Sequence, residues 1–312
     1  MKNTVPKPAI PDSKIMVIKK LIAPHFDPTY HFHPEYQLFL VLEGTGTRFV
    51  GDTVKPFRKG DLVLTGPNLP HLWRNENDYF DKRNKLSTAG VVIYFHDFFL
   101  GSPIHQKDEF ENIQHLLLKS VYGLEVLGET NQVVSKMMID LLNLRGIKSV
   151  IQLLKILEAI AVSTECHQIT HKEYIPLSKE IETDRMNKIY AYVMKNFHQK
   201  IDLKTIAELI YMTPSSFSRY FKSRVNKSFS DFLQEIRISH ACKLLREEDV
   251  TIGEAADTAG FQTLSNFNKQ FKKSIGKSPL IYKKECLKQK LERSEIFEWS
   301  NPDFIAGLSN KI

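Results

Sequence analysis

The chain has 312 residues, 42% of them hydrophobic, with 43 Lys and Arg against 36 Asp and Glu and a formal net charge of +7. This length predicts about two domains, and the composition is that of a globular protein and excludes a disordered chain. Three widely spaced cysteines exclude a disulfide framework or a cysteine metal site. Because no apolar run approaches the about 18 residues of a membrane span and no hydrophobic signal region is visible, we expect a soluble, cytoplasmic protein without a membrane partner.

Residues 15–100 consist of short segments rich in β-branched and aromatic residues, such as YQLFLVLEG and GVVIYFHDFF. Gly, Pro, Asn and Asp separate them at intervals of about 8–12 residues, which is typical of an all-β sandwich or barrel. Gly44, Gly46 and the pair Gly51-Asp52 suit hairpin turns. We therefore predict an antiparallel β-barrel over this range.

Within the predicted barrel, His31 and His33 are two positions apart, a spacing that points both side chains to one face of a strand. His71 on a neighbouring strand would bring three imidazoles together. A barrel mouth is a common ligand site, and imidazole suits Zn, Fe, Ni or Cu. Two interpretations stay open: the histidines line a pocket for a small polar effector, or they bind a metal. The candidate effector contacts are His31, His33, Glu35, Arg48, His71 and Trp73.

From about residue 106 to 165 the pattern becomes helical, with apolar residues three and four apart in QVVSKMMIDLLNL and VIQLLKILEAIAVS. The apolar stripes are broad, so we expect these helices to pack against the barrel, one another or a second copy of the chain. A homodimer through one of them is a hypothesis. Residues 1–166 are thus predicted to form one sensory and dimerisation domain. Residues 167–184 are polar, contain Pro176 and lack periodicity, which predicts a linker.

Basic charge is concentrated in residues 185–290, which hold 20 Lys and Arg and 10 Asp and Glu, so the rest of the chain is net acidic. We predict that this segment is an all-α domain that meets nucleic-acid phosphates. A basic surface without a partner is the alternative. Residues 291–312 have weak pattern and are predicted to be a tail without an assigned function.

The end of the basic segment, about residues 251–273, has the pattern of a helix-turn-helix unit. Small residues recur at helical spacing and Gly260 interrupts them, as a turn residue with positive φ would. Phe267 and Phe271 then mark the buried stripe of a second helix, whose other faces are polar and basic. Helix, glycine turn and amphipathic helix in this order favour DNA binding.

The same pattern occurs about fifty residues upstream, over about residues 202–222. Met212 aligns with Phe261, Phe217 aligns with Phe267, and the second copy has one extra residue in its turn. Internal repetition of this kind is diagnostic of architecture. A long amphipathic helix, SDFLQEIRISHACKLLRE, separates the copies and is predicted to be a rigid spacer that sets the two recognition helices about 10 base pairs apart on one face of the duplex.

Polar residues beside each buried stripe are the candidate DNA contacts. Arg219 and Lys269 occupy equivalent positions, so one role for both is the simplest interpretation, and an Asn side chain can pair with adenine. The lysines near the end of each stripe suit phosphates. The candidates are Ser215, Ser216, Ser218, Arg219 and Lys222 in the first unit, and Ser265, Asn266, Asn268, Lys269, Lys272 and Lys273 in the second.

These features together resemble the AraC/XylS family of bacterial transcription regulators. In the C-terminal third the resemblance depends on Arg237, Ala241, Leu244-Leu245, Ala256, Gly260-Phe261, Phe267, Phe271-Lys272, Gly276, Ser278-Pro279 and Tyr282. The N-terminal part is similar to the family's cupin-type sensory barrel. That similarity depends on His31, His33-Pro34-Glu35, Gly44, Gly60-Asp61, Pro67-Asn68, Pro70-His71 and Trp73.

The resemblance implies an α+β multidomain fold with a cupin-like barrel, packing helices and two helix-turn-helix units. It implies a DNA-binding transcription regulator, activator or repressor, whose barrel senses a small molecule, with sugars as candidates, or mediates dimerisation. Its expected partners are double-stranded DNA and a second copy of the chain, with RNA polymerase as a further candidate. The runner-up is a metal-dependent cupin enzyme with a DNA-binding appendage. Metal cupins usually supply a carboxylate where this chain has Gln37, so we expect no metal cofactor and no catalytic residue. Lys269 and Lys283 stand where the family usually has Arg, which loosens any bidentate base recognition at Lys269.

Overall fold

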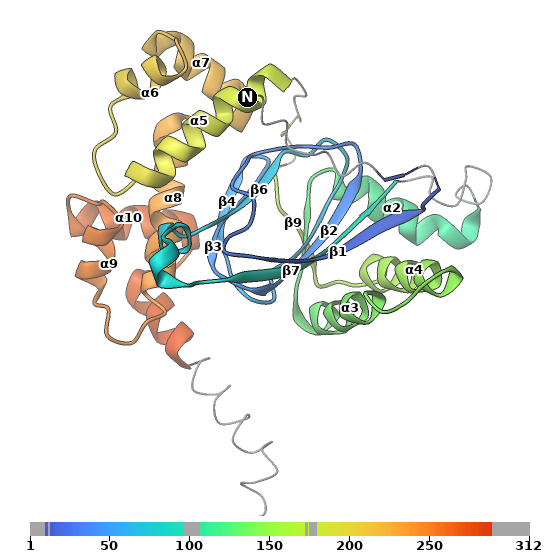
Figure 1. Cartoon of the computed structure of the whole chain (residues 1–312). Coiled ribbons are helices and arrows are strands. Elements are labelled where there is room, and N and C mark those ends of the chain that lie inside the picture. Colours follow the sequence, from blue (N-terminus) through green and yellow to red (C-terminus); the bar gives the residue numbers. More distant parts are fainter. Residues whose placement is uncertain (1–9, 12, 97–106, 172–173, 175–179, 289–312) are drawn as a thin grey trace, which may run out of the picture. The chain divides into compact units, whose positions relative to one another are not determined.

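The computed structural model describes residues 10–11, 13–96, 107–171, 174 and 180–288 (Figure 1). These residues group into two compact units, of which the first spans 1–195 with 202–229 and the second 196–201 with 230–312. The predicted tail, 291–312, lies outside the described residues. So do residues 97–100 of the predicted barrel and residues 172–173 and 175–179 of the predicted linker.

The N-terminal part of the first unit contains two antiparallel sheets, as the alternating, turn-punctuated sequence predicts. The larger has the strand order β1-β7-β2-β5-β8-β9 and the smaller the order β4-β3-β6. A two-residue turn at Gly51-Asp52 joins β3 to β4, confirming the hairpin expected there. The strands are β1 Met16–Ala23, β2 Tyr36–Glu43, β3 Gly46–Val50, β4 Thr53–Phe57, β5 Leu62–Thr65, β6 His71–Asn75, β7 Thr88–Phe95, β8 Leu124–Val126 and β9 Cys166–Gln168.

Strand β2 is buried on both faces, which explains its nearly continuous apolar sequence. Phe39 and Val41 belong to the core that includes Trp73 of the smaller sheet. Leu38 and Leu40 point to the opposite face and belong to the core formed with the helices. The larger sheet therefore separates two hydrophobic cores, and the first, which includes Trp73, lies between the sheets.

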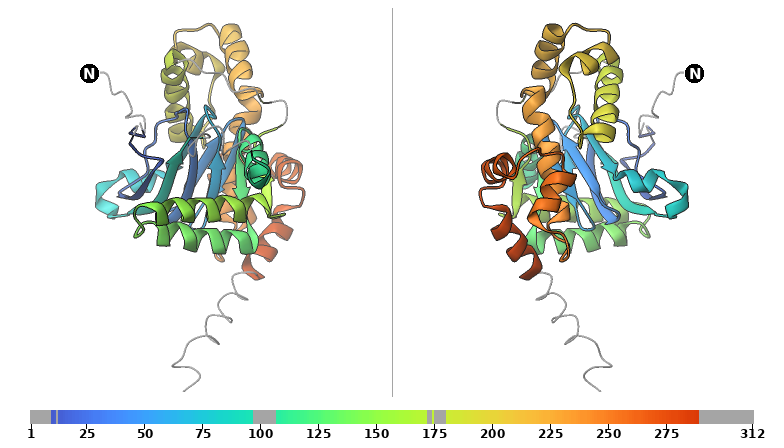
Figure 2. Two further views of the ribbon diagram at one scale, coloured as in Figure 1. Left: turned by 90° about the vertical axis from the view of Figure 1, so that its right-hand side faces the viewer. Right: turned by 90° about the vertical axis from the view of Figure 1, so that its left-hand side faces the viewer.

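Three helices cover the outer face of the larger sheet, and α3 and α4 lie side by side (Figure 2). Their buried residues repeat at three- and four-residue spacing, which confirms the expectation that they pack against the β structure and one another. The helices are α2 Glu111–Ser120, α3 Gly128–Leu141 and α4 Ile147–Ala161.

The chain after α4 continues the β structure for several residues. Strand β9 pairs with β8, and Ile169 and Tyr174 are buried in the core that contains Phe39. The first residues of the predicted linker are therefore part of the N-terminal fold. The two buried side chains anchor this otherwise polar segment to the core.

From residue 180 to 288 the described chain consists of helices joined by turns and short loops. Three short 3₁₀ segments, Asn77–Phe80, Lys82–Asn84 and Asp108–Phe110, precede it. Helix α8 runs without interruption between the two helix-turn-helix units, in agreement with the amphipathic pattern of its sequence. Residues 279–288 are also helical. The helices are α5 Glu180–Asn196, α6 Leu203–Leu209, α7 Pro214–Val225, α8 Phe229–Leu244, α9 Ile252–Thr258 and α10 Leu264–Ile275. Over the described ranges, no helix combines the length and hydropathy needed to cross a bilayer.

Candidate DNA interface and effector pocket

Helices α6 and α7 form the first helix-turn-helix unit. The Asp202 side chain caps α6 by accepting a hydrogen bond from Lys204 N, and Thr213 caps α7 by accepting one from Ser216 N at 3.3 Å. On α7, Phe217 and Phe221 are fully buried, as the four-residue spacing predicts. The buried stripe fixes the rotation of the helix, so the other faces of α7 are exposed.

Helices α9 and α10 form the second unit in the same way. A capping box between Thr251 and Glu254 begins α9, and Thr263 caps α10 by accepting a hydrogen bond from Asn266 N. Phe267 and Phe271 are buried with their ring centroids 5.4 Å apart. These phenylalanines are core residues and are not available to stack on bases.

The turns of the two units follow the same backbone path. Met212 N donates to Ala207 O at 2.9 Å, and Phe261 N donates to Ala256 O at 3.0 Å, so both turns close five residues after the equivalent alanine. The additional residue predicted for the second turn is Gln262, which stands between Phe261 and the capping threonine. The internal repeat read from the sequence is therefore a structural repeat.

The predicted DNA contacts lie on the exposed faces of α7 and α10. Arg219 and Lys269 are both exposed, each two positions after a buried phenylalanine, and neither forms an ion pair within the described chain. The Ser218 hydroxyl donates to Pro214 O at 2.9 Å, so part of its capacity is used inside the helix. The half-buried candidate is Ser216. The exposed candidates are Ser215, Ser218, Arg219, Lys222, Ser265, Asn266, Asn268, Lys269, Lys272 and Lys273.

Two other basic residues, both in the second compact unit, stabilise it by hydrogen bonds to backbone carbonyl oxygens. Arg237 on α8 donates to the carbonyl oxygens of Phe197 and Gln199, each at 2.8 Å. Lys283 donates to the carbonyl oxygens of Glu248 and Val250, at 2.7 and 2.6 Å. Basic charge alone does not separate such structural residues from DNA contacts.

The three histidines predicted to converge do so. One ring nitrogen from each of His31, His33 and His71 can be chosen so that all lie within 4.8 Å of one another. The expected strand geometry was wrong, however: His31 forms only an isolated bridge to His71, and His33 precedes β2. Pro34 follows directly, and proline cannot donate a ladder hydrogen bond. The extended segment still places the His31 and His33 rings beside His71, the first residue of β6.

Each of these rings is oriented by a backbone carbonyl. Nδ1 of His31 donates to Thr29 O at 2.7 Å, and Nδ1 of His71 donates to Leu69 O at 2.7 Å. Burial lowers the pKa of both imidazoles, as does the proximity of the other histidines. The two rings are therefore neutral at physiological pH.

Glu35 and Gln37 both contact the His33 ring. Nδ1 of His33 lies 3.0 Å from Glu35 O and 3.3 Å from Glu35 Oε2, whereas Nε2 of His33 lies 3.3 Å from the side-chain oxygen of Gln37. Glu35 thus contacts the histidine on the side away from Gln37. The Tyr94 ring packs on His33 at 5.3 Å, and burial, with Glu35 and Asp27 nearby, raises its pKa to about 12.

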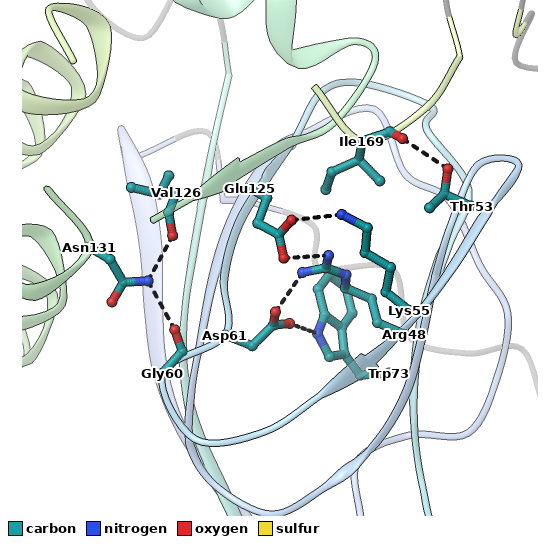
Figure 3. A network of polar contacts seen from close by, with 10 residues as sticks. All are labelled: Arg48, Thr53, Lys55, Gly60, Asp61, Trp73, Glu125, Val126, Asn131 and Ile169. Atoms are coloured by element: carbon teal, nitrogen blue, oxygen red, sulfur yellow. Dashed lines mark hydrogen bonds and ion pairs between the residues drawn. The ribbon is translucent and has the colours of Figure 1, made fainter. Parts of the chain in front are cut away.

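Trp73 and Arg48 are part of a buried polar network (Figure 3). Asp61 accepts hydrogen bonds from Trp73 Nε1 at 2.9 Å and from Arg48 Nη1 at 2.6 Å. Nη2 of Arg48 contacts Glu125 Oε1 at 2.9 Å, and Lys55 contacts the other oxygen of Glu125 at 3.0 Å. Arg48 is 1% exposed and already carries two carboxylate partners, so it reaches the histidines only through Asp61 and Trp73.

Sequence reasoning missed several functional candidates of the pocket. Tyr94 could have been found, because it alternates with buried apolar residues on a strand. Glu125 could not, because it lies 77 positions from Arg48 in a short strand of no clear pattern. Gln37 was noted only as a poor metal ligand.

Comparison with known proteins supports both halves of this description. The family profile described as a helix-turn-helix domain matches residues 206–285, and one described as a cupin domain matches residues 20–79. The melibiose operon regulatory protein of Escherichia coli (strain K12) is 23% identical over 274 residues, which cover 84% of this chain and 85% of that protein. The Msm operon regulatory protein of Streptococcus mutans is 23% identical over 83% of this chain and 89% of its own length.

A more similar but shorter match is the uncharacterized HTH-type transcriptional regulator YobQ of Bacillus subtilis, 30% identical over 93 residues, or 30% of this chain. The aligned region spans 39% of YobQ. The relatives that align along most of the chain are both named as operon regulatory proteins. With a cupin domain, two structurally repeated helix-turn-helix units and these relatives, the chain belongs to the AraC/XylS family of transcription regulators.

Proposed function

We propose that this protein regulates transcription by inserting α7 and α10 into successive major-groove segments of one operator, about 10 base pairs apart. The observation that carries this proposal is the equivalence of Arg219 and Lys269. Both are exposed cations that follow a buried phenylalanine on the second helix of a capped helix-turn-helix unit. Arg and Lys bind guanine O6 and N7, whereas the lysines near the end of each helix suit phosphates.

We also propose that the barrel binds a small polar effector through the predicted pocket residues. A cluster of three imidazoles beside Glu35, Gln37 and Tyr94 offers both hydrogen-bond donors and acceptors. Trp73 supplies an aromatic surface 5.8 Å from His71. Sugars are the first candidates, because one relative is named for the melibiose operon. Arg48 would act indirectly, by holding Asp61 and Trp73.

Selection of bound sequences from a random DNA pool, with and without candidate sugars, tests both parts. We expect a preferred operator with two half-sites one helical turn apart, and a change in its affinity when the effector is present. Failure to enrich any sequence would contradict the regulator. If an operator is enriched but no effector changes its affinity, the protein binds DNA constitutively and the barrel is purely structural.

A homodimer through α3 or α4 is a further part of the proposal. On α4, Ile147 and Ile151 are four positions apart and 70% and 46% exposed, and α3 also exposes Val133. Exposed apolar residues at helical spacing suit a self-complementary helix contact. Sedimentation equilibrium with and without DNA tests this. We expect Ile151→Lys to give monomers and Lys155→Glu, at an exposed position on the same helix, to leave the dimer intact.

RNA polymerase is the partner expected if the protein activates transcription. Transcription in vitro from a promoter that carries the selected operator would distinguish activation from repression. An increase in transcript that depends on the operator would support the contact with the polymerase, and a decrease would contradict it.

A further inference from the structure

Leu264, the first residue of α10, is a large apolar side chain that is 49% exposed. Its spacing from Phe267 and Phe271 continues the apolar stripe of the helix, yet both phenylalanines are fully buried and Leu264 is not. Thr263, directly before it, caps the helix, so the leucine has no capping role. Neither the core nor the start of the helix therefore accounts for a leucine at this position.

The neighbours of Leu264 on the surface of α10 are polar. Residues four apart on a helix lie one above the other, so Leu264 begins a row that continues with Asn268 and Lys272, both exposed. Ser265, the next residue in the chain, is exposed as well. In a recognition helix the N-terminal residues contact base edges, whereas a lysine farther along suits a phosphate. The apolar group thus stands at the end of the row that suits bases.

The first helix-turn-helix unit has a different residue at the equivalent position. Pro214 is the first residue of α7 and, like Leu264, directly follows the threonine that caps its helix. Proline is common at the first helical position, because its fixed φ suits the helix and its missing N–H would have no partner there. Helix geometry accounts for Pro214 in this way, whereas leucine has no such advantage. The two units therefore differ in the apolar group that each offers to the groove.

We propose that Leu264 makes the second unit prefer thymine at one position of the operator, by packing on the 5-methyl group of that base. This inference rests on the proposed function, in which α10 lies in the major groove. The methyl group distinguishes thymine there, since the other bases are recognised by their hydrogen-bond donors and acceptors. A leucine side chain has no hydrogen-bonding group, so this methyl is the base-edge feature that it can recognise.

Replacement of thymine by deoxyuridine tests the contact, because it removes the methyl group and leaves the hydrogen-bonding groups of the base unchanged. The probe is the operator selected from the random pool by the full chain, with each thymine of the α10 half-site replaced in turn. Fluorescence anisotropy measures the affinity for each operator. For one of these positions we expect the wild type to bind about fourfold more weakly, the loss that corresponds to burial of one methyl group.

Three variants assign this methyl dependence to a side chain. Leu264→Ala should bind the thymine and deoxyuridine operators equally, whereas Leu264→Met, which keeps a long apolar side chain, should retain most of the difference. Leu280→Ala is the matched control, because Leu280 is 51% exposed and lies outside α7 and α10. It should show the wild-type dependence. Thermal melting of each variant shows whether a change in binding is a change in fold.

Several results would overturn the proposal. One is a selected α10 half-site that contains no thymine, and another is a half-site in which no thymine depends on its methyl group. Equal methyl dependence in Leu264→Ala and the wild type would also overturn it, because another side chain would then make the contact. These results leave the proposed function intact, since an operator is still preferred. Failure to enrich any operator would instead remove the regulator and the contact with it.

Discussion

Tyr30 and Asn187 are 157 positions apart and exchange two hydrogen bonds within the first unit. The Asn187 side-chain oxygen accepts from Tyr30 N at 2.5 Å, and its Nδ2 donates to Tyr30 O at 3.2 Å. The Tyr30 ring also packs on Tyr190 at 4.7 Å. Because His31 is the next residue, the segment that carries a pocket histidine is tied directly to α5, the helix that precedes the first helix-turn-helix unit.

We therefore expect Asn187→Ala to uncouple the pocket from DNA binding. Both hydrogen bonds are lost, so the Tyr30 amide should exchange with solvent faster and an effector should change operator affinity less than in the wild type. Hydrogen exchange and operator titrations with and without effector measure this. Lys195→Ala, an exposed change on the same helix, is the control. An unchanged effector response in Asn187→Ala would show that this contact does not transmit the signal.

Lys269→Ala should cost about 1–3 kcal/mol on the selected operator, if Lys269 reads a base edge. The Arg219→Ala variant should show a loss of similar size, because the two residues occupy equivalent positions. Fluorescence anisotropy on the operator and on unrelated DNA makes the comparison, with Lys284→Ala as a control outside the recognition helices. An equal loss on both DNAs would identify a phosphate contact only.

Arg48→Met should destabilise the first compact unit by up to about 3–5 kcal/mol, because it removes the buried cation shared by the half-buried carboxylates of Asp61 and Glu125. Urea denaturation at neutral pH measures the loss. In the triple variant Arg48→Met/Asp61→Asn/Glu125→Gln the only charge left without its partner is that of Lys55, whose exposed side chain is solvated, so the cost should be smaller. A triple variant less stable than Arg48→Met would mean that the carboxylates stabilise the fold by other contacts.

The network also predicts a pH dependence. Burial raises the pKa of Glu125, but Arg48 and Lys55 outweigh burial and hold that pKa below its ordinary value of 4.5. The stabilisation by Glu125 is therefore fully present above that ordinary value, and it is lost as the pH falls through the lowered pKa. The difference in unfolding free energy between the wild type and Glu125→Gln should shrink over this acidic range. A difference that stays constant from pH 6 to about pH 3 would contradict the assignment.

The sequence predicts those parts of the structure that depend on residues close together in the chain. Phe267 and Phe271 are spaced for one helix face, and the equivalent pair in α7 repeats the spacing, so both helix-turn-helix units follow from period and repetition. Gly51-Asp52 marks its hairpin for the same reason. The polar candidates of α7 and α10 are exposed because the buried stripe fixes the helix rotation.

The parts that the sequence does not predict depend on residues far apart in the chain. A buried Arg48 looks like any surface arginine until Asp61 and Glu125, 13 and 77 positions away, are brought beside it. The spacing of His31 and His33 predicts convergence but not the loss of strand geometry, because Pro34 interrupts the ladder locally. Nor does spacing fix which ring nitrogen faces inward, since that depends on the carbonyl each Nδ1 meets.

The two turns of the repeat differ in what they can display. Gly260 adopts φ +84°, and a Cβ there would lie 2.6 Å from His198 O, so the second turn has no room for a side chain. The equivalent residue of the first turn is Tyr211, which adopts φ +59° and is 92% exposed. A tyrosine in this conformation costs about 1–2 kcal/mol relative to a right-handed residue. The second turn is therefore closed to substitution, whereas the first turn presents the Tyr211 ring to solvent. The side chain at position 211 can change to suit a neighbouring molecule without any change in the two recognition helices.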